Sequence, residues 1–155
     1  MSETTAKAAD TIPQRDDIDT KHKWNLADIF TDDNAWEKAF ENAQKLIEDA
    51  KNYVGKLSES PETLYNCLED RSSLSLSVFQ LYQYAKLQKD LDNRLSKYQA
   101  MTDRAAMLSS QADAAFSFVE PELMKIDDAT LKSMGDKFEK NDIYGFLGHN
   151  GAGKS

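Results

Sequence analysis

Apolar residues recur every three or four positions along residues 95–119, and this periodicity constrains the fold more than any other feature of the chain. Side chains with this spacing lie on one face of an α-helix. The pattern predicts one long amphipathic helix of about seven turns, which the Glu120-Pro121 pair should end or kink because proline clashes with the preceding turn. The stripe consists of Leu95, Tyr98, Met101, Ala105, Leu108, Ala112, Ala115, Phe116 and Val119.

A second stripe predicts another long helix, which Gly55 should end. Residues 31–34 are good helix-capping types, and Asn34 with Glu37 has the spacing of a capping box. An apolar cluster of Trp24, Leu26, Ile29 and Phe30 precedes this start. The stripe itself consists of Trp36, Phe40, Ala43, Ile47, Ala50 and Val54.

Between these stripes, Ser60-Pro61 predicts the start of a third helix, since proline is favoured at the first helical position. Residues 73–78 alternate with the period of a β-strand. Helical spacing resumes immediately after them, so we interpret the whole segment as helix. Residues 90–93 should supply the next break and cap, and a short helix is expected over residues 127–134. The apolar positions of the third helix are Leu64, Tyr65, Leu68, Val78, Leu81, Tyr82 and Ala85.

These elements predict an all-α fold, an antiparallel bundle of three long helices plus a short one. Residues 1–22 are polar and should form a flexible arm. Residues 23–134 should form the helical domain. Residues 135–155 change in character, to a short strand without a partner and a phosphate-binding loop.

The composition excludes several classes of protein. The chain has 155 residues, a formal net charge of −8 and a pI of about 4.8, which disfavours nucleic acid as a partner. It contains one cysteine, Cys67, no signal-peptide pattern and no apolar run of membrane-spanning length. We therefore expect a cytoplasmic protein that binds neither nucleic acid nor membrane.

Residues 148–155 match the phosphate-binding motif G-x-x-x-x-G-K-S. In such a loop, backbone N–H groups surround phosphate oxygens, the lysine reaches the outer phosphates and the serine binds magnesium. Residues 140–155 resemble the strand and Walker A loop of ABC transporter ATPases, which implies Mg-ATP as ligand, although His149 stands where that family usually has proline. The candidate phosphate-binding residues are Gly148, Asn150, Gly151, Gly153, Lys154 and Ser155.

The loop should nevertheless be inert in this sequence. A phosphate loop depends on the N–H groups and dipole of the helix that follows it, and the sequence stops at Ser155. The Walker B aspartate, signature segment and switch histidine of ABC ATPases would lie beyond that point. We therefore expect a residual motif without ATPase activity.

Three sequence runs give the larger part of the chain a second resemblance. K-W-N-L-A-D-I-F at residues 23–30, L-Y-Q-Y-A at 81–85 and E-P-E-L at 120–123 resemble, in order and spacing, the N-terminal helical region of oligoendopeptidase F, a family of zinc peptidases. The resemblance spans residues 14–134. It implies a cytoplasmic enzyme that cuts short peptides inside a deep channel, with this region as part of the channel wall.

The zinc chemistry of that family has no counterpart in this sequence. A peptidase of this kind needs two histidines one helical turn apart, a glutamate base between them and a further carboxylate ligand. The only histidines are His22 and His149, and neither lies in H-E-x-x-H. We therefore expect no catalytic residue, metal ligand or cofactor in this chain.

Other candidate groups have structural interpretations that we favour. The adjacent aspartates at 16–17, 32–33 and 127–128 should be helix caps or solvated charges rather than acid–base pairs. Cys67 has no basic neighbour in the sequence and should be a quiet thiol, and His22 should be exposed. Five tyrosines offer flat contact area for a peptide groove, but most should belong to the core or its rim: Tyr53, Tyr65, Tyr82, Tyr84 and Tyr98.

The leading hypothesis is a truncated peptidase wall fused near residues 134–141 to the beginning of an ABC ATPase, without catalysis of its own. Its partners would be peptides or the missing catalytic domain. Two alternatives remain: a nucleotide-binding fragment of an ABC transporter, and a helical interaction module that self-associates through uncovered apolar faces.

Titration with Mg-ATP tests the inert loop. Isothermal calorimetry on the full chain should detect no binding tighter than millimolar, because the first-turn N–H groups that hold phosphate are missing. Tighter binding that disappears in Lys154→Ala would contradict this expectation.

Overall fold

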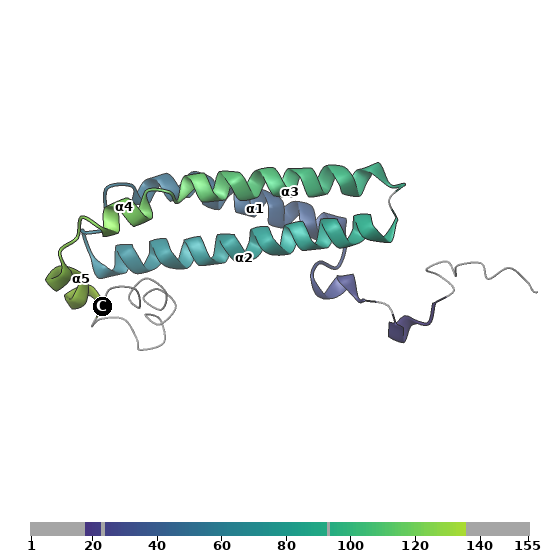
Figure 1. Ribbon diagram of the computed structural model, residues 1–155, viewed down its shortest axis with the longest axis horizontal. Helices are drawn as coiled ribbons and strands as arrows, with labels where there is room; N and C mark the ends of the chain where they lie inside the picture. Colours follow the sequence, from purple (N-terminus) through teal and green to yellow (C-terminus); the bar gives the residue numbers. More distant parts are fainter. Residues whose placement is uncertain (1–17, 23, 93, 136–155) are drawn as a thin grey trace, which may run out of the picture.

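The computed structural model describes residues 18–22, 24–92 and 94–135, and in these ranges the chain forms only helices and turns (Figure 1). The predicted all-α class is confirmed. The strand and phosphate-binding loop predicted within residues 135–155 lie, apart from Gly135, outside the described residues. The helices are α1 (Asp33–Asp49), α2 (Pro61–Leu91), α3 (Ser96–Ala115), α4 (Val119–Leu123) and α5 (Asp128–Gly135).

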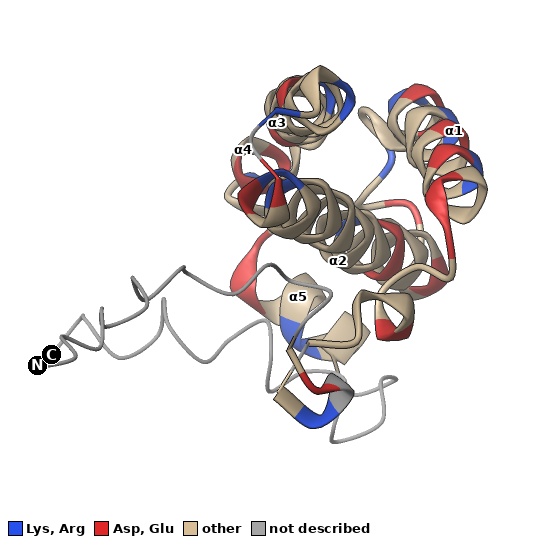
Figure 2. Ribbon diagram, turned by 90° about the vertical axis from the view of Figure 1, so that its right-hand side faces the viewer, with Lys and Arg blue, Asp and Glu red and all other residues tan. Residues whose placement is uncertain are grey.

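Three long helices run side by side along the length of the molecule (Figure 1). Viewed nearly end-on, α1, α2 and α3 occupy the corners of a triangle (Figure 2), and α5 lies beyond the end of the bundle at which α2 begins (Figure 1). The short connections make consecutive helices antiparallel, and the α2–α3 interface is the most extensive contact in the bundle. The predicted antiparallel bundle is therefore the observed architecture.

Trp36 lies at the centre of the core. Its side chain is fully buried, its indole Nε1 donates to the Leu81 carbonyl of α2 at 2.8 Å, and its ring stacks on Phe40 at 5.2 Å between centroids. This hydrogen bond satisfies the only polar atom that Trp36 takes into the interior. The residue therefore joins α1 to α2 without leaving a buried donor unpaired.

The start of α2 follows the prediction. Pro61 occupies the first turn, and the Ser60 hydroxyl accepts from the Thr63 backbone N–H at 3.0 Å. Residues 73–78 are helical despite their strand-like alternation, because Leu74 and Val78 are four residues apart and both lie in the core. The leucine between them, Leu76, faces solvent.

The cap of α1 differs from the predicted capping box. The Asp32 carboxylate accepts from the Ala35 backbone N–H at 2.8 Å, so Asp32 is the cap and Asn34 lies inside the helix. Glu37 does not reach back to the helix start. It binds Arg104 of α3 instead, because a bidentate guanidinium offers stronger hydrogen bonds than one backbone N–H.

The α1 stripe also ends earlier than predicted. The helix ends at Asp49 and continues as a 3₁₀ turn over Ala50–Tyr53, which rotates Val54 away from the core and leaves it 51% exposed. Gly55 then adopts a positive φ of 77°, a conformation that glycine allows without strain. It ends the helical segment, as predicted, and its N–H donates to Glu122 of α4.

The predicted single helix over residues 95–119 is two helices. The chain leaves α3 at Ala115 and re-enters α4 at Val119, before Pro121, which lies in the first turn of α4 where its missing N–H does no harm. Phe116 in the intervening turn and Val119 at the start of α4 are both buried. The Ser117 hydroxyl donates to the Ala114 carbonyl at 2.8 Å within this turn.

The predicted cap at residues 90–93 is not a cap of α3. Asp92 accepts from the Arg94 backbone N–H and guanidinium, and Leu95 occupies the cap position, so it lies at the surface rather than in the stripe. The short helix predicted at 127–134 is α5, and the Asp127 carboxylate caps it by accepting from the Thr130 N–H at 2.9 Å.

The segment before α1 contributes less to the core than its apolar cluster predicted. Leu26 is buried and Phe30 packs edge-on against Tyr84, but Trp24 is 78% exposed. Of the predicted arm, residues 18–22 are described, and they contain a 3₁₀ turn at Thr20–His22. His22 is exposed, as expected.

The two tryptophans provide a matched test of the core. Trp36→Ala should lower the free energy of unfolding by about 3–5 kcal/mol, since it leaves a large cavity between the helices. Trp24→Ala should change it by less than about 0.5 kcal/mol. Urea denaturation followed by far-ultraviolet circular dichroism measures both. Equal effects of the two substitutions would contradict this description of the core.

Candidate functional site

A surface groove runs between α2 and α3, and we call it the α2/α3 groove. It has two adjoining sections with volumes of about 250 and 380 Å³, which share Ser75, Ala112 and Asp113. None of its lining residues comes from α1. The first section is lined by Arg71, Leu74, Ser75, Ala112, Asp113, Phe116, Ser117 and Glu120, and the second by Ser75, Val78, Phe79, Tyr82, Ala106, Ser109, Ser110, Ala112 and Asp113.

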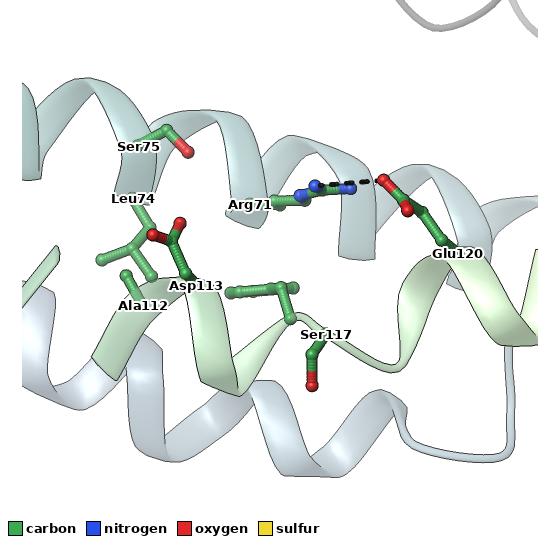
Figure 3. Close-up of a pocket in the computed structure, with 8 residues that line it drawn as sticks. Arg71, Leu74, Ser75, Ala112, Asp113, Ser117 and Glu120 are labelled. Carbon is green, nitrogen blue, oxygen red and sulfur yellow. Dashed lines mark ion pairs between the residues drawn. The ribbon is translucent and has the colours of Figure 1, made fainter. Parts of the chain in front are cut away.

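The first section is polar, and an ion pair closes its end. Arg71 of α2 extends toward Glu120 of α4, with 4.0 Å between the guanidinium and the carboxylate (Figure 3). The side chains of Ser75 and Asp113 project into the space between the helices from opposite sides (Figure 3). This section therefore presents a hydroxyl, a carboxylate and an ion pair in sequence along its length.

The second section is more apolar. Phe79 projects from α2 with 59% of its surface exposed, and the partly buried Tyr82 lies one turn further along. On the α3 side the lining residues Ala106, Ser109 and Ser110 are small, so they leave the groove open beside the two aromatic rings.

Tyr82 is the one predicted tyrosine that lines this groove. The hydroxyls of Tyr84 and Tyr98 both donate to Asp33, at 2.9 and 3.3 Å, and the Tyr53 hydroxyl donates to Asp70. Tyr84 is buried, and Tyr53 and Tyr98 pack against the core. The prediction that most tyrosines belong to the core or its rim is confirmed for these three residues. The groove itself was not identified from the sequence periodicity.

Asp33 joins all three long helices. It lies in the first turn of α1 and accepts from Tyr84 of α2 and from Lys97 and Tyr98 of α3. Partial burial acts to raise the pKa of Asp33, but hydrogen bonds from Lys97 and Tyr84 and the Lys97 charge outweigh it and hold the pKa below 3.8. Burial and the Asp33 hydrogen bond raise the pKa of Tyr84 to about 12. Asp33 therefore remains ionised at neutral pH as a structural cross-link.

A second cross-link binds α1 to α3 one turn further on. The Arg104 guanidinium donates to both oxygens of Glu37 at 2.7 and 2.8 Å, and its carbon lies 5.0 Å from the Trp36 ring centroid and 4.3 Å from that of Phe40. The hydrogen bonds from Arg104 lower the pKa of Glu37. Arginine is suited to this position because its planar group stacks on rings while it binds a carboxylate.

The remaining sequence candidates have structural roles or lie outside the described residues. Cys67 is buried, and burial, with the Asp70 charge, raises the pKa of its thiol to about 11, which fits the expected quiet cysteine. Asp32 and Asp127 are caps. The described part of the chain contains no group of three His, Cys, Asp or Glu side chains arranged to hold a metal ion. The six phosphate-loop candidates, Gly148 to Ser155, fall outside it.

Comparison with known proteins links this fold to peptidases. Oligopeptidase PepF of Bacillus subtilis (strain 168) is 33% identical over 138 residues, which is 89% of this chain and 21% of the relative. Group B oligopeptidase PepB of Streptococcus agalactiae is 31% identical over 119 residues, 77% of this chain and 20% of the relative. This chain is homologous to oligoendopeptidase F. It spans about a fifth of the length of these curated relatives.

The homology extends to the three-dimensional fold. The crystal structure of oligoendopeptidase-F from Enterococcus faecium superposes with a TM-score of 0.64 at 23% identity, over 73% of this chain and 22% of that one. The predicted resemblance to the helical region of oligoendopeptidase F is thus confirmed. No family model matches the chain.

The resemblance of residues 140–155 to ABC transporter ATPases gains no support from these comparisons and stays a prediction. Within the described ranges, no helix is both long enough and apolar enough to cross a lipid bilayer.

Replacing the Asp33 carboxylate tests the cross-link. Asp33→Asn should lower the free energy of unfolding at neutral pH by about 1–2 kcal/mol, because hydrogen bonds to a charged group are lost. The folded-state pKa is depressed, so this stabilisation is present above the ordinary pKa of 3.8 and is lost as the pH falls through the folded-state value. Denaturation across the acid range should therefore show a steeper pH dependence for the native chain than for Asp33→Asn. Parallel curves would refute the cross-link.

Proposed function

We propose that this chain is the channel-wall part of a peptidase of the oligoendopeptidase F type and has no catalysis of its own. The observation that carries the proposal is the match of 89% of this chain to about a fifth of a relative that is itself an oligopeptidase. The relative's catalytic machinery can therefore lie in the larger part of its length, which this chain does not match.

The residues of this chain do not fit the zinc that the family implies. The sequence contains two histidines and no H-E-x-x-H, and the described residues hold no metal-binding group of side chains. Any hydrolysis would therefore depend on ligands from another polypeptide segment. The role left for this chain is to bind, shape or enclose.

The bundle has the physical properties of such a wall. Asp33 and the Glu37–Arg104 pair fix α1 on α2 and α3, and the described residues include no buried side-chain N or O atom without a hydrogen bond. A wall of this kind stays in place while peptides enter, which supports exclusion of folded substrates by shape.

The fusion to an ABC ATPase remains the finer part of the sequence hypothesis. It rests on residues 140–155 alone, and no structural observation on the described residues favours nucleotide binding.

Reconstitution tests the wall role. The full chain should restore cleavage of a short fluorogenic peptide when mixed with Bacillus subtilis oligopeptidase PepF from which the matching fifth has been removed, and should cleave nothing alone. Trp36→Ala should restore less activity because the cavity destabilises the wall, whereas Trp24→Ala should restore it fully. Peptide cleavage by the isolated chain, or no association with the shortened relative, would overturn the proposal.

A further inference from the structure

We propose that the α2/α3 groove binds a short peptide that carries a basic residue next to a large apolar one. This inference rests on the proposed function, because it names the substrate class for which the wall selects. It also stands on its own observations, since the groove has the length, the apolar surface and the charge for such a ligand.

The length of the groove fits a short extended peptide. From Arg71 to Tyr82 the groove follows α2 for about 16 Å, given a rise of about 1.5 Å per helical residue. An extended peptide advances about 3.3 Å per residue, so about five residues span this distance. The Arg71–Glu120 ion pair marks one end (Figure 3).

The aromatic section supplies the apolar contact. Phe79 is 59% exposed, although its neighbours along the helix, Val78 and Leu81, are buried. The ring of Phe79, and the accessible part of the Tyr82 ring, lie beside small residues of α3 and offer contact area to an apolar side chain. The hydroxyls of Ser75, Ser109 and Ser110 lie along the same path and can exchange hydrogen bonds with a peptide backbone.

The charge of the groove favours a basic side chain beside the apolar side chain of the peptide. Arg71 compensates Glu120, while no ion pair involves Asp113 among the described residues. The carboxylate of Asp113 therefore gives the middle of the groove a negative charge, and the net charge of −8 attracts cations toward the whole chain. A second copy of this chain would bring the same negative charge, so charge complementarity favours a basic peptide over self-association.

Nuclear magnetic resonance on the full ¹⁵N-labelled chain tests this inference with defined probes. The probes are the end-blocked pentapeptide Gly-Phe-Lys-Gly-Gly and its Gly-Phe-Glu-Gly-Gly counterpart. The lysine peptide should shift the amide signals of Ser75, Phe79, Tyr82, Ser110 and Asp113. It should bind about threefold to fivefold more tightly than the glutamate peptide at low salt. High salt should reduce this preference.

Two groove variants and a matched control locate the binding. Asp113→Asn should abolish the preference for lysine over glutamate, and Phe79→Ser should weaken both peptides. Glu41→Gln makes the same charge change on the exposed surface of α1 and should preserve the preference. The dispersion of the amide spectrum confirms that each variant is folded.

Three outcomes would overturn the inference: no binding at several millimolar peptide, shifts confined to surfaces outside the groove, or a lysine preference that survives Asp113→Asn. The reconstitution experiment distinguishes failure of the groove proposal from failure of the proposed wall function. If the shortened relative regains activity with Asp113→Asn and Phe79→Ser while peptides leave the groove amides unshifted, the wall role stands and the groove is not its peptide-binding surface.

Discussion

The hydrogen bond from the Trp36 indole to the Leu81 carbonyl is the constraint on which the bundle depends. A fully buried indole is stabilising only when its N–H finds an acceptor. Leu81 supplies one from the middle of α2, and this requirement fixes the rotation and height of α1 on its neighbour. With Trp36 in place, Arg104 can lie over its ring and bind Glu37, so the position of α3 follows from the same residue.

The polar cross-links and the α2/α3 groove are consequences of one arrangement. Asp33 and Glu37 direct α1 onto one side of the α2–α3 pair, and no α1 residue lines the groove between those two helices. The groove between α2 and α3 therefore remains accessible from the surface. In the wall role that we propose for this chain, the groove is the surface that contacts peptides.

The sequence predicted the helices well and their ends poorly, for identifiable reasons. Burial of Trp36, Phe40 and Ala43 follows from a spacing that any helix must obey. Helix ends depend on which of several possible partners each side chain binds, and the sequence does not decide this. Asp32 caps α1, and Glu37 binds Arg104, which is distant in sequence. The turn after Ala115 likewise allows both Phe116 and Val119 to be buried. Their spacing from the preceding apolar residues had predicted that the helix continues through them. The groove was not predicted because its lining residues come from two helices and form no motif that is local in the sequence.

The location of Cys67 makes the bundle suitable for measuring its own opening. Its sulfur is fully buried on α2, and its raised pKa keeps it a neutral thiol at physiological pH. Alkylating reagents react with exposed thiolates, so the rate of modification is set by how often the interior separates. Cys67 carries the single thiol of this chain, so its modification rate measures local unfolding without an introduced label site.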